Sequence, residues 1–145
     1  MRLIGLLGLL HALRRSEIVA VRMDDIVRGS LAIRSPRRHL PLDPVTQVAV
    51  DAAVAHRHGT GTRNPHLFVS AFTAAGSRPV SGGFISTMVA AGSGHSPREL
   101  RATRLAALVD GLDAISAGNA VGLDPKNALY YRGDSRTPFI EASLT

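Results

Sequence analysis

Residues 96–101 read SPRELR and define the start of a helix more sharply than any other stretch of the chain. Ser96 is a favoured N-cap residue, and Pro97 suits the first helical position. Glu99, at the third position, can reach back to the N-cap backbone, so the stretch forms a complete capping box. We therefore predict a helix that begins at residue 97.

Two arginines share one face of this predicted helix. Arg98 and Arg101 lie three residues apart, and Leu105 and Leu108 continue the same stripe. Two cations near the positive end of a helix dipole are mutually unfavourable, and a phosphate there would accept hydrogen bonds from both guanidinium groups. The spacing favours an anion site; the alternative interpretation is a solvated basic face.

Composition points towards a basic globular domain. The 145 residues carry 17 Lys plus Arg against 11 Asp plus Glu, a formal net charge of +6, and 45% of them are hydrophobic, so the chain can bury the core of one domain. The absence of cysteine excludes disulfide scaffolds and thiolate metal sites. All but one of the basic residues are arginine, which favours planar, bidentate anion partners, with nucleic acid as the leading class.

The apolar N-terminus allows two interpretations. Met1 and Arg2 precede LIGLLGLLHAL (3–13), which is similar to a secretory signal but lacks a small-x-small cleavage site before the charged residues 14–17. The stretch is also too short to span a bilayer. Leucines repeat at helical spacing through it, which favours a core helix; they are Leu3, Leu6, Leu7, Leu10 and Leu13.

The next segments predict a short helix followed by a small sheet. Residues 16–23 (SEIVAVRM) predict the helix, which ends at the acidic turn 24–25. Residues 26–42 change to apolar and β-branched runs with turn signals at 29–30 and 35–36, which indicates two or three short antiparallel strands.

Further helices follow the sheet. Asp43 as N-cap and Pro44 as first residue begin a helix that ends near residues 58–59. Its expected apolar side consists of Val45, Val48, Ala49 and Ala52. Loops surround a short apolar run at 66–72, and the remaining predicted helices cover 84–92, the segment from 97, 113–122 and 125–132. The predicted fold class is α+β, mainly α, with one domain over residues 1–134 and a C-terminal tail over 135–145.

Taken in order, these motifs resemble those of the catalytic domain of tyrosine recombinases, the phage integrase family. The resemblance rests on HALRRSEI (11–18), the acidic turn, a basic hairpin that ends in LPL (40–42), SPRELR (96–101), and the segment 121–131 with its two tyrosines. It covers nearly the whole chain.

The resemblance implies DNA cleavage by a tyrosine that attacks a phosphodiester and forms a 3′-phosphotyrosine intermediate, without a metal. Such chemistry needs guanidinium groups on the nonbridging oxygens and a general acid for the leaving oxygen. By resemblance, Arg14 and Arg101 match the two arginines, and Glu17 matches the acid that helps to orient the first. Tyr131 matches the nucleophile, with Tyr130 as the alternative.

Several positions depart from the family pattern. Arg98 stands where the family has a histidine, and Leu123 stands where it has a second histidine or a tryptophan. The hairpin lysine is absent, because Lys126 is the only lysine of the chain. Arginines occupy the hairpin instead and could support phosphate binding, but arginine gives up a proton poorly; they are Arg34, Arg37 and Arg38.

The expected function is therefore that of a truncated and diverged recombinase domain that binds double-stranded DNA with weak or no strand transfer. The family's N-terminal DNA-clamping domain is expected to be absent, since Met1 lies in the first helix. We expect a cytoplasmic, nucleoid-associated bacterial protein that forms oligomers through its tail. The apolar residues of that tail are Phe139, Ile140 and Leu144.

Simpler interpretations remain for the same residues. Arg14 can be the polar end of a buried helix, Glu17 a first-turn acid that suits the helix dipole, and Tyr131 a packed aromatic. The alternative function is a small helical protein–protein interaction domain without a DNA role. No cofactor or metal is expected, because the histidines at 56, 58 and 66 lack an accompanying carboxylate.

Overall fold

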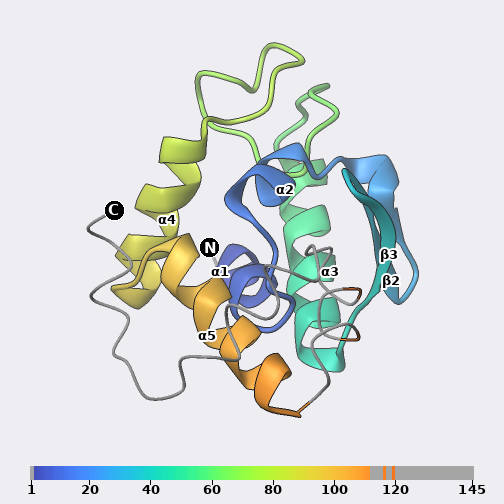
Figure 1. Cartoon of the computed structure of the whole chain (residues 1–145). Helices are drawn as coiled ribbons and strands as arrows, with labels where there is room; N and C mark the ends of the chain where they lie inside the picture. The colour runs from blue at the N-terminus through green and yellow to red at the C-terminus, as the bar shows by residue number, and fades with distance from the viewer. Residues whose placement is uncertain (1, 112–115, 117–118, 120–145) are drawn as a thin grey trace.

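The computed structural model describes residues 2–111, 116 and 119, and Figure 1 shows their arrangement. The chain is mainly helical with one small antiparallel sheet of order β1-β2-β3, which confirms the predicted fold class. Within the described residues, no helix combines the length and apolar character needed to cross a membrane. The elements are α1 (Arg2–Leu9), α2 (Arg15–Ala20), the 3-10 helix η1 (Met23–Asp25), β1 (Ile26–Val27), β2 (Ser30–Arg34), β3 (Arg37–Pro41), α3 (Pro44–Gly59), α4 (Gly82–Ser93) and α5 (Pro97–Gly111).

Helix α1 lies at the centre of the fold, in contact with α3, α4 and α5 (Figure 1). Leu3, Ile4 and Leu7 are buried in the main hydrophobic core. Burial of such a side chain stabilises a fold by about 1.5–3 kcal/mol. The interpretation of the apolar N-terminus as a core helix is confirmed.

The chain reverses direction directly after α1, earlier than the leucine pattern predicts. The helix ends at Leu9, and the backbone N–H of Leu13 donates to the Leu7 carbonyl at 3.0 Å. Ala12 adopts a left-handed backbone conformation with φ of 53° and is fully buried. Leu13 therefore enters the core from the turn rather than from the helix.

Helix α2 is shorter than the predicted helix over 16–23. It ends at Ala20, because the next backbone groups pair with a distant segment. The carbonyl of Val21 accepts from the N–H of Leu67, and the N–H of Met23 donates to the carbonyl of Pro65, both at 2.9 Å. These long-range bonds replace the next turn of helix.

The predicted antiparallel strands and both turns are confirmed. Strand β2 pairs with β1 and with β3, and the second register runs from Ser30 opposite Pro41 to Arg34 opposite Arg37. Alternate residues of β2 are buried, which places one face of the sheet on the core.

Asp43 caps α3 as predicted, but of the predicted apolar side only Ala49 is buried, while Val45, Val48 and Ala52 are exposed. The Asp43 carboxylate accepts the backbone N–H groups of Val45 and Thr46, whereas the side chains of Val45 and Val48 are 47% and 65% exposed. The buried stripe consists of Thr46, Ala49, Val50 and Arg57. Thr46 and Arg57 face inward because each has polar partners there.

Helices α4 and α5 complete the described fold. Helix α4 begins at Gly82 with Ser81 as N-cap, two residues before the predicted start. The capping box of α5 is confirmed, since Glu99 accepts the N–H of Ser96 at 2.6 Å and donates its own N–H to the Ser96 hydroxyl at 3.2 Å. Of the predicted helix 113–122 only residues 116 and 119 are described, and both are helical. The predicted helix 125–132 and the tail lie outside the described residues.

Substitution of Ala12 by valine tests the left-handed turn. The β-branched side chain is poorly compatible with a φ of 53°, and the position is fully buried, so we expect Ala12→Val to lower the free energy of unfolding by about 2 kcal/mol or more. Urea denaturation measures the loss. The control Ala20→Val, at an exposed helical position, should change stability by about 0.5 kcal/mol or less; equal effects at both positions would contradict the turn geometry.

The α3 cap predicts a specific acid sensitivity. Hydrogen bonds from the Thr46 hydroxyl and backbone hold the pKa of Asp43 at about 2, below its ordinary value of 3.8. Because the folded pKa is depressed, this stabilisation is present above pH 4 and disappears as the pH falls towards 2. Chemical denaturation should show Asp43→Asn less stable than the wild type at pH 7, with the difference narrowing between pH 4 and pH 2. Parallel stability curves would contradict this assignment.

Candidate functional site

Arg14 stands at the N-terminal end of α2 and lines a cavity of about 250 Å³ between α2 and β2. Its side chain is exposed, and among the described residues no ion pair involves it. Glu17 and Arg34 line the same cavity. The Glu17 carboxylate accepts the backbone N–H of Arg14 at 2.6 Å. Glu17 therefore fixes the backbone of Arg14 and leaves the guanidinium directed to solvent.

A buried ion pair holds Glu17 in place. The Nη1 atom of Arg38, on β3, donates to Glu17 Oε1 at 2.7 Å, and the two side chains are 13% and 3% exposed. Removal of one partner of such a pair typically costs about 3–5 kcal/mol, because the other charge stays buried. Arg38 thus connects the hairpin to the start of α2 and supports Glu17.

The side chain of Arg15, the residue after Arg14, contacts helix α4. Its Nη1 atom donates to the Ser86 hydroxyl of α4 at 3.3 Å. A Cβ atom at Gly82 would lie 2.8 Å from Arg15 Nε, so the glycine leaves room for this side chain. Of the two neighbouring arginines, only Arg14 lines the cavity between α2 and β2.

Arg101 reaches the loop that carries Arg14. Its Nε atom donates to the backbone carbonyl of Ala12 at 2.7 Å, and its side chain is half-buried between α5 and this loop. The bond joins α5 to the chain two residues before Arg14. Arg101 is therefore joined to the same loop that leads into Arg14.

The remaining predicted site residues are not all brought together. Arg98 is exposed on the first turn of α5, whereas Arg101 is half-buried and bonds the Ala12 carbonyl. The two arginines therefore differ in their exposure to solvent. Arg37 is exposed at the start of β3. Tyr130 and Tyr131 lie outside the described residues, as do Leu123 and Lys126.

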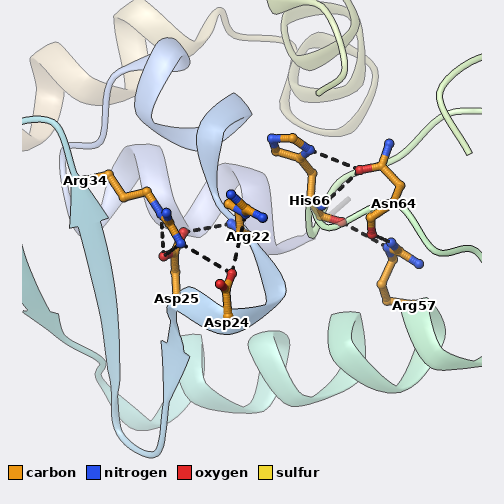
Figure 2. A network of polar contacts seen from close by, with 7 residues as sticks. All are labelled: Arg22, Asp24, Asp25, Arg34, Arg57, Asn64 and His66. Carbon is orange, nitrogen blue, oxygen red and sulfur yellow. Dashed lines mark hydrogen bonds and ion pairs between the residues drawn. The ribbon is translucent and has the colours of Figure 1, made fainter. Parts of the chain in front are cut away.

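Arg34, in the hairpin, is held by acidic residues of η1 (Figure 2). Its Nε and Nη2 atoms approach Asp25 Oδ1 at 2.7 Å, and Nη2 lies 3.4 Å from Asp24 Oδ1. Asp25 is buried and also accepts the backbone N–H of Arg22 at 2.9 Å. The hydrogen bond to Asp25 raises the pKa of Arg34 above its ordinary value, so this group is even less able to release a proton.

A second polar cluster in Figure 2 fixes the loop that follows α3. The buried Arg57 donates to the carbonyls of Asn64 and His66, and Asn64 Nδ2 donates to the carbonyls of Thr73 and Arg78 at 2.8 Å. His66 forms a β-bridge with Arg22, which connects the two clusters. Burial, together with the charge of Arg22, lowers the pKa of His66.

No metal centre is found in this part of the chain. Among residues 2–111, 116 and 119, no three His, Asp or Glu side chains come close enough together to hold an ion. The carboxylates beside Arg14 are both engaged: Glu17 with Arg38, and Asp25 with Arg34. Arg14 is therefore the charged lining residue of this cavity for which no ion pair is recorded among the described residues.

Sequence reasoning missed two features of this site. Asp25 follows Arg22 by three residues, the same spacing as Glu17 after Arg14, and in both pairs the acid accepts the backbone N–H of the arginine. That repeated spacing is a signal that could have identified the role of Asp25. The bond between Arg101 and the Ala12 carbonyl has no such signal, because a backbone acceptor leaves no trace in the residue type.

Comparison with known proteins supports the fold at low sequence identity. A scan against protein-family models gives no match, and neither does a search of curated protein sequences. Solved structures do match. The XerA recombinase aligns with a TM-score of 0.75 and 18% identity over 96% of this chain and 53% of its own.

Two further matches are structures of complexes with DNA. XerH site-specific recombinase bound to its difH substrate aligns with a TM-score of 0.70 and 15% identity, over 98% of this chain and 44% of its own. The Tn1549 transposon integrase in complex with transposon right end DNA aligns with a TM-score of 0.67 and 14% identity, over 98% of this chain and 56% of its own. This chain spans about half the length of the recombinases that it matches. It therefore has the fold of the tyrosine-recombinase catalytic domain, as its motifs predict.

Proposed function

We propose that this chain is a DNA-binding domain of the tyrosine-recombinase type, in which Arg14 and Arg101 hold one backbone phosphate of double-stranded DNA. The observation that carries the proposal is the 2.7 Å bond from Arg101 Nε to the Ala12 carbonyl, which joins α5 to the loop that carries Arg14. Two guanidinium groups that approach one phosphate from different elements provide both charge and orientation.

DNA as the partner is supported by charge and by the complexes of similar proteins. The net charge of +6, carried almost entirely by arginine, favours a polyanion. The matching XerH and Tn1549 integrase structures contain DNA. Contacts from arginines to phosphates confer affinity without sequence specificity.

Strand cleavage is proposed to be weak or lost, although Tyr131 is the candidate nucleophile. The leaving oxygen needs an acid, and Arg98 replaces the family's histidine. Arg34, Arg37 and Arg38 occupy the hairpin, where the family has a lysine, and of these Arg34 is paired with Asp25 and has a raised pKa. Arginine is a poor proton donor at each of these positions, so the acid step lacks an efficient group.

The alternative of a helical interaction domain without a DNA role is less well supported. It depends on the leucine-rich first helix being available to a partner. In the fold that helix is α1, whose Leu3 and Leu7 are buried against the rest of the domain. A helix with its apolar face already covered has little surface to offer.

We further propose that the domain covers residues 1–134 and that the tail, 135–145, mediates self-association. The support is the apolar Phe139, Ile140 and Leu144, in a segment outside the described residues. Binding to DNA would place the protein at the bacterial nucleoid, in the cytoplasm.

Removal of the two arginines tests the phosphate site. Arg14→Ala and Arg101→Ala should each weaken binding to duplex DNA by roughly 10-fold to 100-fold, since each removes charge-assisted hydrogen bonds. The slope of log affinity against log salt should fall by about 0.9 for each phosphate that the variant no longer neutralises. Fluorescence anisotropy at several salt concentrations measures both quantities.

Arg2→Ala is the matched control, because this exposed arginine lines a different cavity, between α1 and α3. Its loss should change affinity by about twofold or less. Equal effects of the three substitutions would show that binding depends on general charge and would contradict a phosphate site at Arg14 and Arg101.

A nicked suicide duplex tests the strand-cleavage part of the proposal. Such a substrate traps a covalent protein–DNA adduct, which a denaturing gel resolves. We expect the wild type to give no more adduct than Tyr131→Phe. An adduct that disappears in Tyr131→Phe would show efficient chemistry, and one that disappears only in Tyr130→Phe would identify the other tyrosine as the nucleophile.

A further inference from the structure

His11 makes a polar contact across the fold from the loop between α1 and α2. Its Nε2 atom lies 2.9 Å from Asp43 Oδ2 and 3.1 Å from the Thr46 hydroxyl, and its side chain is 10% exposed. The other carboxylate oxygen of Asp43 accepts the backbone N–H groups of Val45 and Thr46. One carboxylate therefore caps α3 with one oxygen and holds the loop with the other.

The charge states of the pair fix the direction of the hydrogen bond. Burial lowers the pKa of His11, and the charge of Arg104 on α5 lowers it further, while Asp43 opposes the shift. The imidazole is thus neutral at pH 7. Because ionised Asp43 can only accept, Nε2 carries the hydrogen and donates it. The groups that face the imidazole are Asp43, the N-cap of α3, Thr46 from α3 and Arg104 from α5.

The loop that His11 holds is the one that meets Arg101. Ala12 follows His11 directly, is fully buried and has a φ of 53°. Its carbonyl is the acceptor for Arg101 Nε. A left-handed residue is costly for alanine, so contacts on both sides must hold the turn in this conformation. His11 supplies the contact on the N-terminal side.

We propose that His11 and Asp43 form a positioning pair for Arg101, which holds the α1–α2 loop so that the Ala12 carbonyl stays directed at Arg101 Nε. The pair contacts neither DNA nor the proposed phosphate and acts only through this loop. Its consequence for DNA rests on the proposed function, whereas its effect on Arg101 exists in the protein alone.

Hydrogen exchange at Arg101 Nε tests the pair without DNA. The Nε–H signal is identified by its absence from the ¹⁵N NMR spectrum of Arg101→Lys. We expect His11→Ala to accelerate its exchange by about tenfold, through loss of a hydrogen bond that orders the acceptor. His11→Gln, which places a neutral N–H donor near the position of Nε2, should restore slow exchange. Unchanged exchange in His11→Ala would overturn the proposal.

Asp43→Ser provides a second variant in case His11→Ala does not fold, as judged by circular dichroism. Serine is also a favoured N-cap residue, so α3 keeps its cap while His11 loses its carboxylate partner. The same acceleration of Arg101 Nε–H exchange is expected. Exchange as slow as in the wild type would overturn the role of Asp43.

Affinity for duplex DNA then tests whether the pair acts through Arg101. His11→Ala should weaken binding about threefold to tenfold in the wild-type background and have no effect in the Arg101→Ala background. An equal loss in both backgrounds would show that His11 acts by another route and would overturn the proposal. If the wild type fails to bind DNA, the proposed function is wrong, and Arg101 exchange in the free protein still decides the role of the pair.

Discussion

The hydrogen bond from Arg101 Nε to the Ala12 carbonyl is the contact on which the site depends. It joins α5, the last described helix, to the turn after α1, the central helix of the core. Because the acceptor is a backbone carbonyl, the position of the Arg101 side chain depends on the backbone conformation at Ala12. The direction of Arg101 therefore depends on a turn that keeps an alanine in the left-handed region.

Arg14 is positioned by a different set of contacts. The buried pair of Glu17 and Arg38 ties β3 to the start of α2, and the same carboxylate accepts the backbone N–H of Arg14. The guanidinium of Arg14 stays exposed at the cavity between α2 and β2. Glu17 thus fixes the backbone of Arg14, whereas the Ala12 carbonyl fixes the side chain of Arg101. The side chain of Arg14 is therefore exposed while its backbone is held by Glu17.

Most of the fold could be predicted from local signals. The capping box at Ser96 and the Asp43 cap are short-range patterns, and both helix starts are where those residues indicate. Apolar spacing failed for α3, where Val45 and Val48 are exposed and Arg57 is buried. Arg57 can be buried because it donates to backbone carbonyls inside the fold, and the spacing of apolar residues does not reveal such acceptors.

The site could be predicted only in part. Arg14, Glu17 and Arg101 are candidates by resemblance, and in the structure Glu17 and Arg101 accept from and donate to the backbone of residues 14 and 12, respectively. The pairing of Arg34 with Asp25 could not be derived, because it depends on how η1 packs beside β2. Residues that act through backbone atoms, such as Ala12, leave no pattern in the sequence.

A crystal structure of this protein with duplex DNA tests the shared phosphate site most directly. We expect the guanidinium groups of Arg14 and Arg101 to lie within about 3 Å of oxygens of the same backbone phosphate. Guanidinium groups on separate phosphates, or DNA bound on another face of the domain, would contradict a shared site.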